Sequence, residues 1–214
     1  MVLPRGCEVW EYSGLPGCRQ ILGSATSDLL NRIGSLAIPQ RYLECRDTRR
    51  AHQELFIRLV PTSSTYYAGH YRGEAFRCLQ YYEVRVTGDP RVGHAAATVP
   101  MEMRDFSADV KRSIDEIEFI WSVHDQTVAK HLKVLATVRI IAALFVYFLE
   151  IHPYANGNGH IGRFLVVTLM SCYLGFPRRF PVEPRPPDPP YTQLISDYRT
   201  GNKLPLEKYL LDCI

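Results

Sequence analysis

The chain has 214 residues, of which 46% are hydrophobic and 22% charged, and this composition suits one compact domain with a full-sized core. Its formal net charge of +3 argues against a nucleic-acid-binding protein that relies on a dense basic field, although binding a nucleotide needs only a few local donors. Nothing in the composition is typical of a disordered chain.

The N-terminus and the longest apolar run bear on location. The first residues lack a basic region followed by an apolar core, so we expect no secretory signal. The longest apolar run, residues 134–149, is shorter than the ~20 residues that a membrane span needs. We therefore expect a buried core helix, no membrane span and a cytoplasmic protein, with export as an effector left open.

The six cysteines form no C-x-x-C pair, and none has a histidine at the spacing of a metal ligand. A chain with a full-sized core does not need disulfide bonds for stability. We expect the cysteines to be mostly reduced and structural, with Cys172 in the core of a helix.

The elements predicted in chain order are helical, with one exception. Helices are expected at about residues 24–34 and 48–59, within an N-terminal helical extension (1–60) to which we assign no role. Aromatic and β-branched residues cluster at 66–73 and 79–86, which predicts a β-hairpin. Further helices are expected at about 105–121, 128–149, up to 174, 191–200 and 205–213.

Two breaks separate the later helices. The helix before Gly175 should end there, because glycine commonly follows a helix C-terminus. Residues 177–190 hold seven prolines, which exclude a helix and predict a stiff surface crossover. The expected architecture is all-α with one β-hairpin flap, and residues 61–214 form its main part within a single compact unit.

A glycine-rich turn joins two strongly apolar segments, and residues 152–163 read HPYANGNGHIGR. Gly157 and Gly159 let the backbone approach a ligand closely, and the first turn of the following helix offers free N–H groups to an anion. His152 lies at one rim of the turn, and Arg163 lies one helical turn further on. One loop therefore offers a base, a phosphate cradle and a cation. The alternative, a simple tight turn with His152 as a cap, does not account for all three.

These residues resemble the Fic motif, H-x-F-x-D/E-G-N-G-R-x-x-R. His152, Gly157, Asn158, Gly159 and Arg163 match it outright, and Tyr154 replaces the phenylalanine. Residues 69–72 are similar to the start of the family's flap hairpin, residues 99–101 resemble the segment after that hairpin, and residues 191–211 resemble the closing helices. The resemblance covers roughly residues 65–214.

The resemblance implies a nucleotidyl transferase that moves AMP or a related group from ATP, or another nucleoside triphosphate, to a Ser, Thr or Tyr hydroxyl of a target protein. His152 would be the general base, Asn158 would bind the α-phosphate and Arg163 the terminal phosphates. The remaining motif positions would hold phosphate oxygens or the loop: Asn156, Gly157, Gly159 and His160 would bind the nucleotide, and Tyr154 would anchor the loop in the core. In most members Mg²⁺ bridges the phosphates, and the flap, residues 66–86, would receive the target as an added strand.

Two positions depart from the motif. Asn156 stands where the family has an acidic Mg²⁺ ligand, and a neutral amide is a weaker ligand for a hard dication. His160 stands where the family has its first arginine. We expect altered nucleotide choice, metal dependence or rate. The alternatives that stay open are a hydrolase that removes such a modification and a nucleotide-binding pseudoenzyme.

Family members are often inhibited by a helix with the pattern S/T-x-x-x-E-G/N. Thr98 and Glu102 have the spacing, but Met103 follows and the position is wrong. We expect no inhibitory helix, so that Arg163 is not covered by a carboxylate of this chain, and a separate inhibitory partner is left open. The family includes both toxins and effectors, and the sequence does not choose between them.

Overall fold

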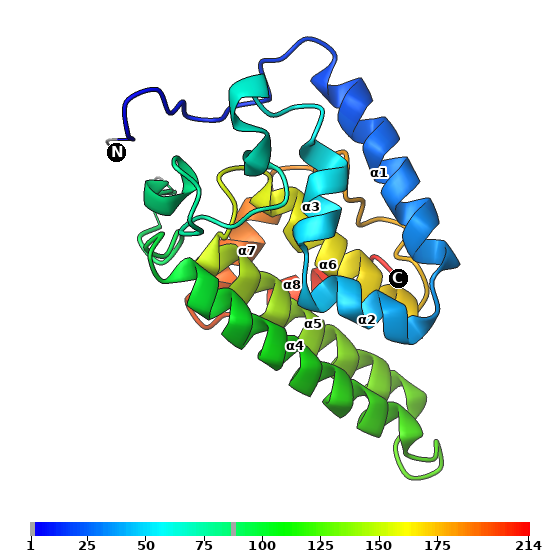
Figure 1. Ribbon diagram of the computed structural model, residues 1–214. Helices are drawn as coiled ribbons and strands as arrows, with labels where there is room; N and C mark the ends of the chain where they lie inside the picture. The colour runs from blue at the N-terminus through cyan, green and yellow to red at the C-terminus, as the bar shows by residue number, and fades with distance from the viewer. Residues whose placement is uncertain (1–2, 87–88) are drawn as a thin grey trace.

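The computed structural model describes residues 3–86 and 89–214, and this part of the chain is helical, with no β-strand (Figure 1). The all-α prediction is therefore confirmed. The α-helices in chain order are α1 (Cys18–Ser35), α2 (Ile38–Arg46), α3 (Arg49–Phe56), α4 (Val99–Ser122), α5 (Lys130–Ile151), α6 (Asn158–Tyr173), α7 (Tyr191–Arg199) and α8 (Leu204–Leu211).

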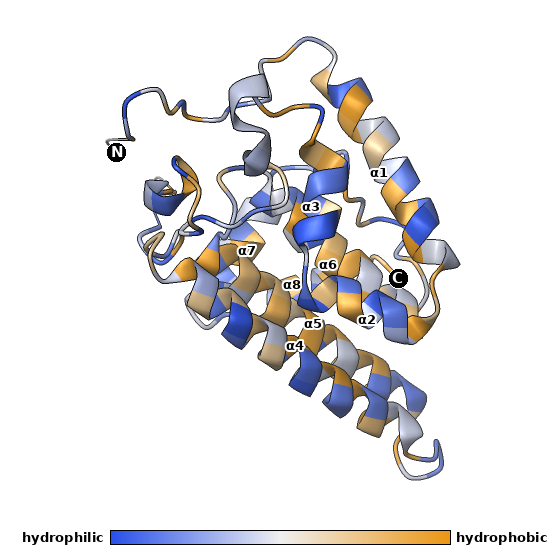
Figure 2. Cartoon of the chain, in the orientation of Figure 1, coloured by the Kyte–Doolittle hydropathy of each residue, from blue (hydrophilic) through white to orange (hydrophobic). Residues whose placement is uncertain are grey.

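Helix α5 is the central element of the fold. It packs most extensively against α6 and α4 and also contacts α7 and α8. Apolar residues cover most of the surface of α5 and α6 (Figure 2), as expected of helices that are buried on several sides. Among the described helices, α5 is the one long and apolar enough to cross a membrane by length and composition. More than half of its most apolar window is buried inside the protein, as in a core helix.

The N-terminal residues contribute to the same core. Helix α2, which the sequence did not predict as a separate helix, packs against α4 and α6, and α1 packs against α3. Helix α3 buries His52 and Phe56 completely. The segment predicted as an extension of no assigned role, residues 1–60, therefore lies against the helices that carry the glycine-rich turn.

The β-hairpin predicted for residues 66–86 does not form. This segment contains two short 3₁₀ helices, η1 (Thr62–Tyr67) and η2 (Leu79–Tyr81), in otherwise irregular structure. Tyr67, Tyr71 and Tyr82 are buried in the core, whereas Tyr81 is exposed. Gly73 has a φ of 81° and lies so close to the Ala96 carbonyl that no side chain fits there. Packing on the helical core thus overrides the local β-propensity.

The expectation that the cysteines are mostly reduced is wrong for one pair. Cys7 and Cys78 form a disulfide that joins residues 71 positions apart. Cys172 is buried on α6, as predicted, and Cys18, Cys45 and Cys213 are likewise buried free thiols. No local spacing could have indicated the pair, because the fold alone brings Cys7 beside Cys78.

Candidate active site

The C-terminus of α5 presents His152 to solvent-accessible space. His152 has a left-handed backbone conformation (φ 54°), and its N–H still caps the helix by bonding to the Phe148 carbonyl. The ring Nδ1 lies 3.1 Å from the Leu149 carbonyl oxygen, which can only accept, so Nδ1 carries the proton. The lone pair of the neutral ring is then on Nε2. Burial lowers the pKa of His152 to about 4, so the ring is unprotonated at neutral pH.

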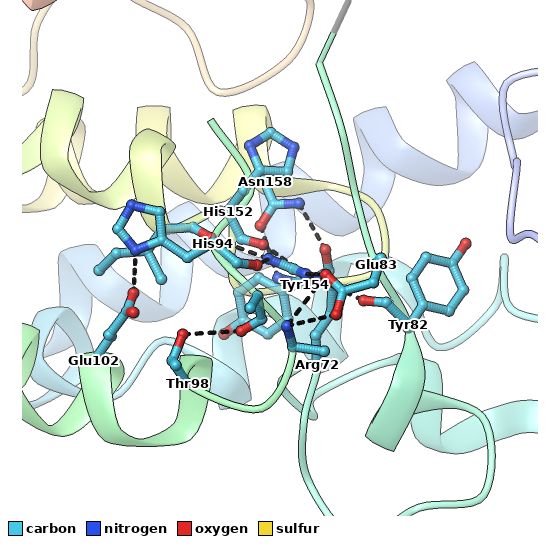
Figure 3. A network of polar contacts seen from close by, with 12 residues as sticks. Arg72, Tyr82, Glu83, His94, Thr98, Glu102, His152, Tyr154 and Asn158 are labelled. Carbon is cyan, nitrogen blue, oxygen red and sulfur yellow. Dashed lines mark hydrogen bonds and ion pairs between the residues drawn. The ribbon is translucent and has the colours of Figure 1, made fainter. Parts of the chain in front are cut away.

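Arg72 holds this helix end in place from within the core (Figure 3). Its guanidinium is fully buried and donates to the carbonyl of His152 at 2.9 Å and to that of Ile151 at 3.1 Å. It also donates to the carbonyls of Tyr82 and His94. A cation at a helix C-terminus is favourable because the last carbonyls are unpaired and carry partial negative charge. Arg72 therefore fixes the backbone from which the His152 ring projects.

The turn between α5 and α6 is held by Tyr154 and Asn158. The Tyr154 ring is fully buried and its hydroxyl lies 2.7 Å from the Thr48 hydroxyl. It stacks flat on His52, with ring centroids 3.7 Å apart. The Asn158 amide bonds both the N–H and the carbonyl of Tyr154, at 2.8 and 2.9 Å. The Asn158 side chain thus links the start of α6 to the preceding turn at Tyr154, and Asn158 also lines the adjoining cavity.

The start of α6 is the region for which the sequence predicts an anion site. Gly157 caps the helix with a φ of 80°, and a Cβ there would lie 2.4 Å from the Phe56 ring. The Arg163 guanidinium lies over Gly159 and donates through Nε to the Val182 carbonyl at 2.8 Å. The start of α6 and the Arg163 guanidinium one turn inside it therefore lie close together.

A cavity of about 560 Å³ opens beside the start of α6. Of the residues selected from the sequence, it is lined by His152, Asn156, Gly157, Asn158, Gly159, His160 and Arg163, whereas Tyr154 lies beneath it in the core. Other lining residues come from α7, namely Tyr191, Thr192, Ile195, Ser196 and Arg199, and Tyr12 of the N-terminal segment also lines it. Its size suits a nucleotide-sized ligand.

A scan against protein-family models matches residues 42–170 to the Fic/DOC family, which is more than half of the chain. The chain belongs to the Fic/DOC family. The match begins within the segment assigned to the N-terminal extension, at α2, and ends within α6. Neither the curated proteins nor the solved structures give a match.

Both departures from the Fic motif have their own partners in this Fic domain. The Asn156 amide oxygen accepts from the Gly157 N–H at 2.7 Å, and its amide nitrogen donates to the Trp10 carbonyl at 2.9 Å. Asn156 thus caps the loop and ties it to the N-terminal segment. Within residues 3–86 and 89–214 no group of three or more His, Cys, Asp or Glu side chains could hold a metal ion. The side chains present therefore do not fit a protein-held Mg²⁺ at Asn156.

His160 is paired with an acid rather than left as a free cation. Its Nε2 lies 2.7 Å from a Glu183 carboxylate oxygen, and burial lowers the pKa of the imidazole although this hydrogen bond raises it. The same bond lowers the pKa of Glu183, so the carboxylate is ionised and accepts the Nε2 proton. Among the described residues no carboxylate forms an ion pair with Arg163, and Glu183 of the proline-rich crossover pairs with His160 instead.

Several residues that hold the site were not predicted to do so. His52 donates from Nε2 to the Asn156 carbonyl at 3.0 Å and accepts from the Gly69 N–H at Nδ1. Trp10, Phe56 and Arg72 also contact the loop or its flanks. In the sequence, the only indication of these supporting residues was the resemblance of residues 69–72 to the start of the family's flap. That resemblance includes Arg72, but it predicted a strand there.

Proposed function

We propose that this Fic domain transfers a nucleoside monophosphate from a nucleoside triphosphate, such as ATP, to a hydroxyl of a target protein. The observation that supports this most directly is the cavity, which gathers a neutral histidine, a helix N-terminus and Arg163 around one volume. A base, an anion cradle and a cation are the groups that phosphoryl-centre displacement needs.

The roles of the residues follow from their positions. Nε2 of His152 takes the proton of the target hydroxyl, and the hydroxyl oxygen forms a bond to the α-phosphorus while the bond to pyrophosphate breaks. The N–H groups at the start of α6 and the guanidinium of Arg163 stabilise the charge that builds on the phosphate oxygens. Asn158 holds the loop so that these donors are preorganised.

The target enters beside the irregular segment 66–86, which carries the exposed Tyr81 and Val86. Because no hairpin edge is formed there, the target would bind through side chains rather than as an added strand. The protein would act on its target with a donor whose metal, if any, is held by the donor's own phosphates and not by Asn156.

The test is intact-mass spectrometry after incubation with ATP, GTP, CTP or UTP, because a transferase of this kind can label its own hydroxyls. We expect a nucleoside-monophosphate increment in the wild type that is lost in His152→Ala. His131→Ala is the matched control, since His131 is exposed near the opposite end of α5. Persistence of the increment in His152→Ala would exclude His152 as the base. Loss of label from a previously modified target would instead identify a hydrolase.

A further inference from the structure

The N-terminal segment 7–12, here called the strap, is fixed across one side of the cavity. The disulfide Cys7–Cys78 tethers one end, and the Glu8 carbonyl accepts from the Tyr67 hydroxyl at 3.0 Å. Trp10 is 2% exposed and donates from its backbone to the Tyr82 hydroxyl and from its ring to the Leu59 carbonyl, both at 2.9 Å. The strap is therefore held in a defined position by covalent and hydrogen-bonded contacts with the rest of the domain.

The other end of the strap reaches the site itself. The Trp10 carbonyl accepts from the Asn156 amide, and Tyr12 lines the cavity. The Tyr12 ring packs on Phe56, with centroids 5.1 Å apart, and Phe56 is also the residue beneath Gly157. The strap and the phosphate cradle thus rest on the same buried ring.

The Tyr12 hydroxyl is a hydrogen-bond donor without a strong acceptor. Burial raises its pKa to about 12, so it stays protonated. It lies 3.4 Å from Nδ1 of His160, whose Nε2–H is committed to Glu183. This contact is long for an O–H donor, so the hydroxyl can turn to a better acceptor. Among the described residues lining the cavity, Tyr12, His160 and Arg163 are present and Glu183 is not.

We propose that the Tyr12 hydroxyl binds the nucleotide by donating a hydrogen bond to its terminal phosphates. The Cys7–Cys78 disulfide holds Tyr12 in this position. The inference rests on the proposed function in that a phosphate-bearing donor enters the cavity. Tyr12 supplies next to Arg163 the neutral donor that partly replaces the cation missing at His160. Reduction of the disulfide releases the strap at one end and weakens phosphate binding.

The first experiment measures the dissociation constant of inorganic pyrophosphate by calorimetry in the oxidised protein. Tyr12→Phe keeps the ring on Phe56 and removes the hydroxyl, and we expect it to weaken binding by about tenfold, the effect of one hydrogen bond to a charged group. Tyr209→Phe, on α8 and outside the cavity, should leave the constant unchanged. Equal constants for Tyr12→Phe and wild type, or no binding of pyrophosphate by the wild type, would overturn the assignment.

The second experiment compares oxidised and reduced protein. We expect a reductant to weaken pyrophosphate binding by the wild type several-fold and to have no effect on Cys7→Ser, which should already bind as the reduced wild type does. Circular dichroism checks that each form is folded. If the wild type bound pyrophosphate equally well with and without reductant, the disulfide would have no role in positioning Tyr12. If pyrophosphate binding follows this pattern but no nucleotide labels any hydroxyl, the proposed transferase function fails and the assignment of Tyr12 stands.

Discussion

At the scale of single residues, Arg72 shows how a buried cation can position a histidine whose ring it does not contact. Its guanidinium bonds four backbone carbonyls, two of which belong to Ile151 and His152 at the end of α5. The left-handed backbone of His152 is a conformation that a residue with a Cβ rarely adopts without support. The Arg72 network supplies that support, so the direction of the His152 ring depends on a residue in the irregular segment.

Replacing Arg72 by lysine should therefore cost both stability and activity. Lysine keeps the charge but has three donors on one atom and cannot reach four carbonyls at once. We expect Arg72→Lys to lower the free energy of unfolding by about 3 kcal/mol, because buried carbonyls are left unpaired, and to reduce transfer activity at temperatures where the variant is folded. Denaturant unfolding and labelling rates measure the two effects.

Arg50→Lys is the control for this experiment. The Arg50 side chain is 62% exposed and forms ion pairs with Glu44 and Glu54, so the change should leave stability within about 0.5 kcal/mol of the wild type. An Arg72→Lys variant as stable and as active as Arg50→Lys would show that the carbonyl network does not position His152.

At the scale of elements, the glycine-rich turn depends on how α3 meets the start of α6. Phe56 is the last residue of α3 and lies directly beneath Gly157. The family motif requires glycine at this position, and the structure gives two separate reasons for it here. The backbone is left-handed, and the Phe56 ring occupies the space of a side chain.

Gly157→Ala tests the second reason, with Gly175→Ala as a matched control. Both glycines have positive φ, 80° and 85°, but a Cβ at Gly175 meets nothing within 4 Å. We expect Gly175→Ala to cost about 1 kcal/mol from backbone strain alone. Gly157→Ala should cost about 3 kcal/mol or more, because the ring or the loop must also move. Urea unfolding measures the free energy of unfolding of both variants. Equal losses would mean that the Phe56 ring moves aside without a measurable loss of stability.

At the scale of the whole molecule, the features that the sequence could predict were the local ones. The residues of the motif lie within one loop, and the apolar helices on either side carry strong periodic signals, so the helices and the turn between them were predictable. The supports of the loop were not, because they come from distant positions. The bonds to the motif come from Arg72, His52 and Trp10 at separations of 80, 104 and 146 residues. Only tertiary packing brings these residues together.

The prediction for the irregular segment failed for the same reason. Its tyrosines have high β-propensity, but the hydrogen bonds of Arg72 and the disulfide of Cys78 belong to partners outside the segment. The β-propensity of a segment depends on its context, and tertiary contacts can override it. Here Tyr67, Tyr71 and Tyr82 are buried against the helical core, and the backbone that carries them is irregular.

One consequence for the whole molecule is its response to acid. His52 is fully buried between Tyr154 and the loop, and burial lowers its pKa from 6.5 to about 3. Its Nδ1 accepts from the Gly69 N–H, and a protonated ring could not accept that bond. The folded protein therefore keeps His52 neutral in a range of pH where the unfolded chain protonates it.

The sign of the effect comes from this difference in bound protons. Above a pH of about 6.5 neither state protonates the ring, and the full stability is present. As the pH falls from there toward about 3, the unfolded state binds a proton that the folded state does not, and the free energy of unfolding declines by up to about 1.4 kcal/mol per pH unit. His52→Gln removes the titrating group while keeping an amide donor and acceptor. Urea unfolding over the upper half of this range should show a shallower decline in the variant, whatever its stability at neutral pH. The carboxylates contribute equally to the pH dependence of both proteins. If the free energy of unfolding declined equally with pH in the two, His52 would be protonated in the folded state, and its Nδ1 could not accept the hydrogen bond from the Gly69 N–H.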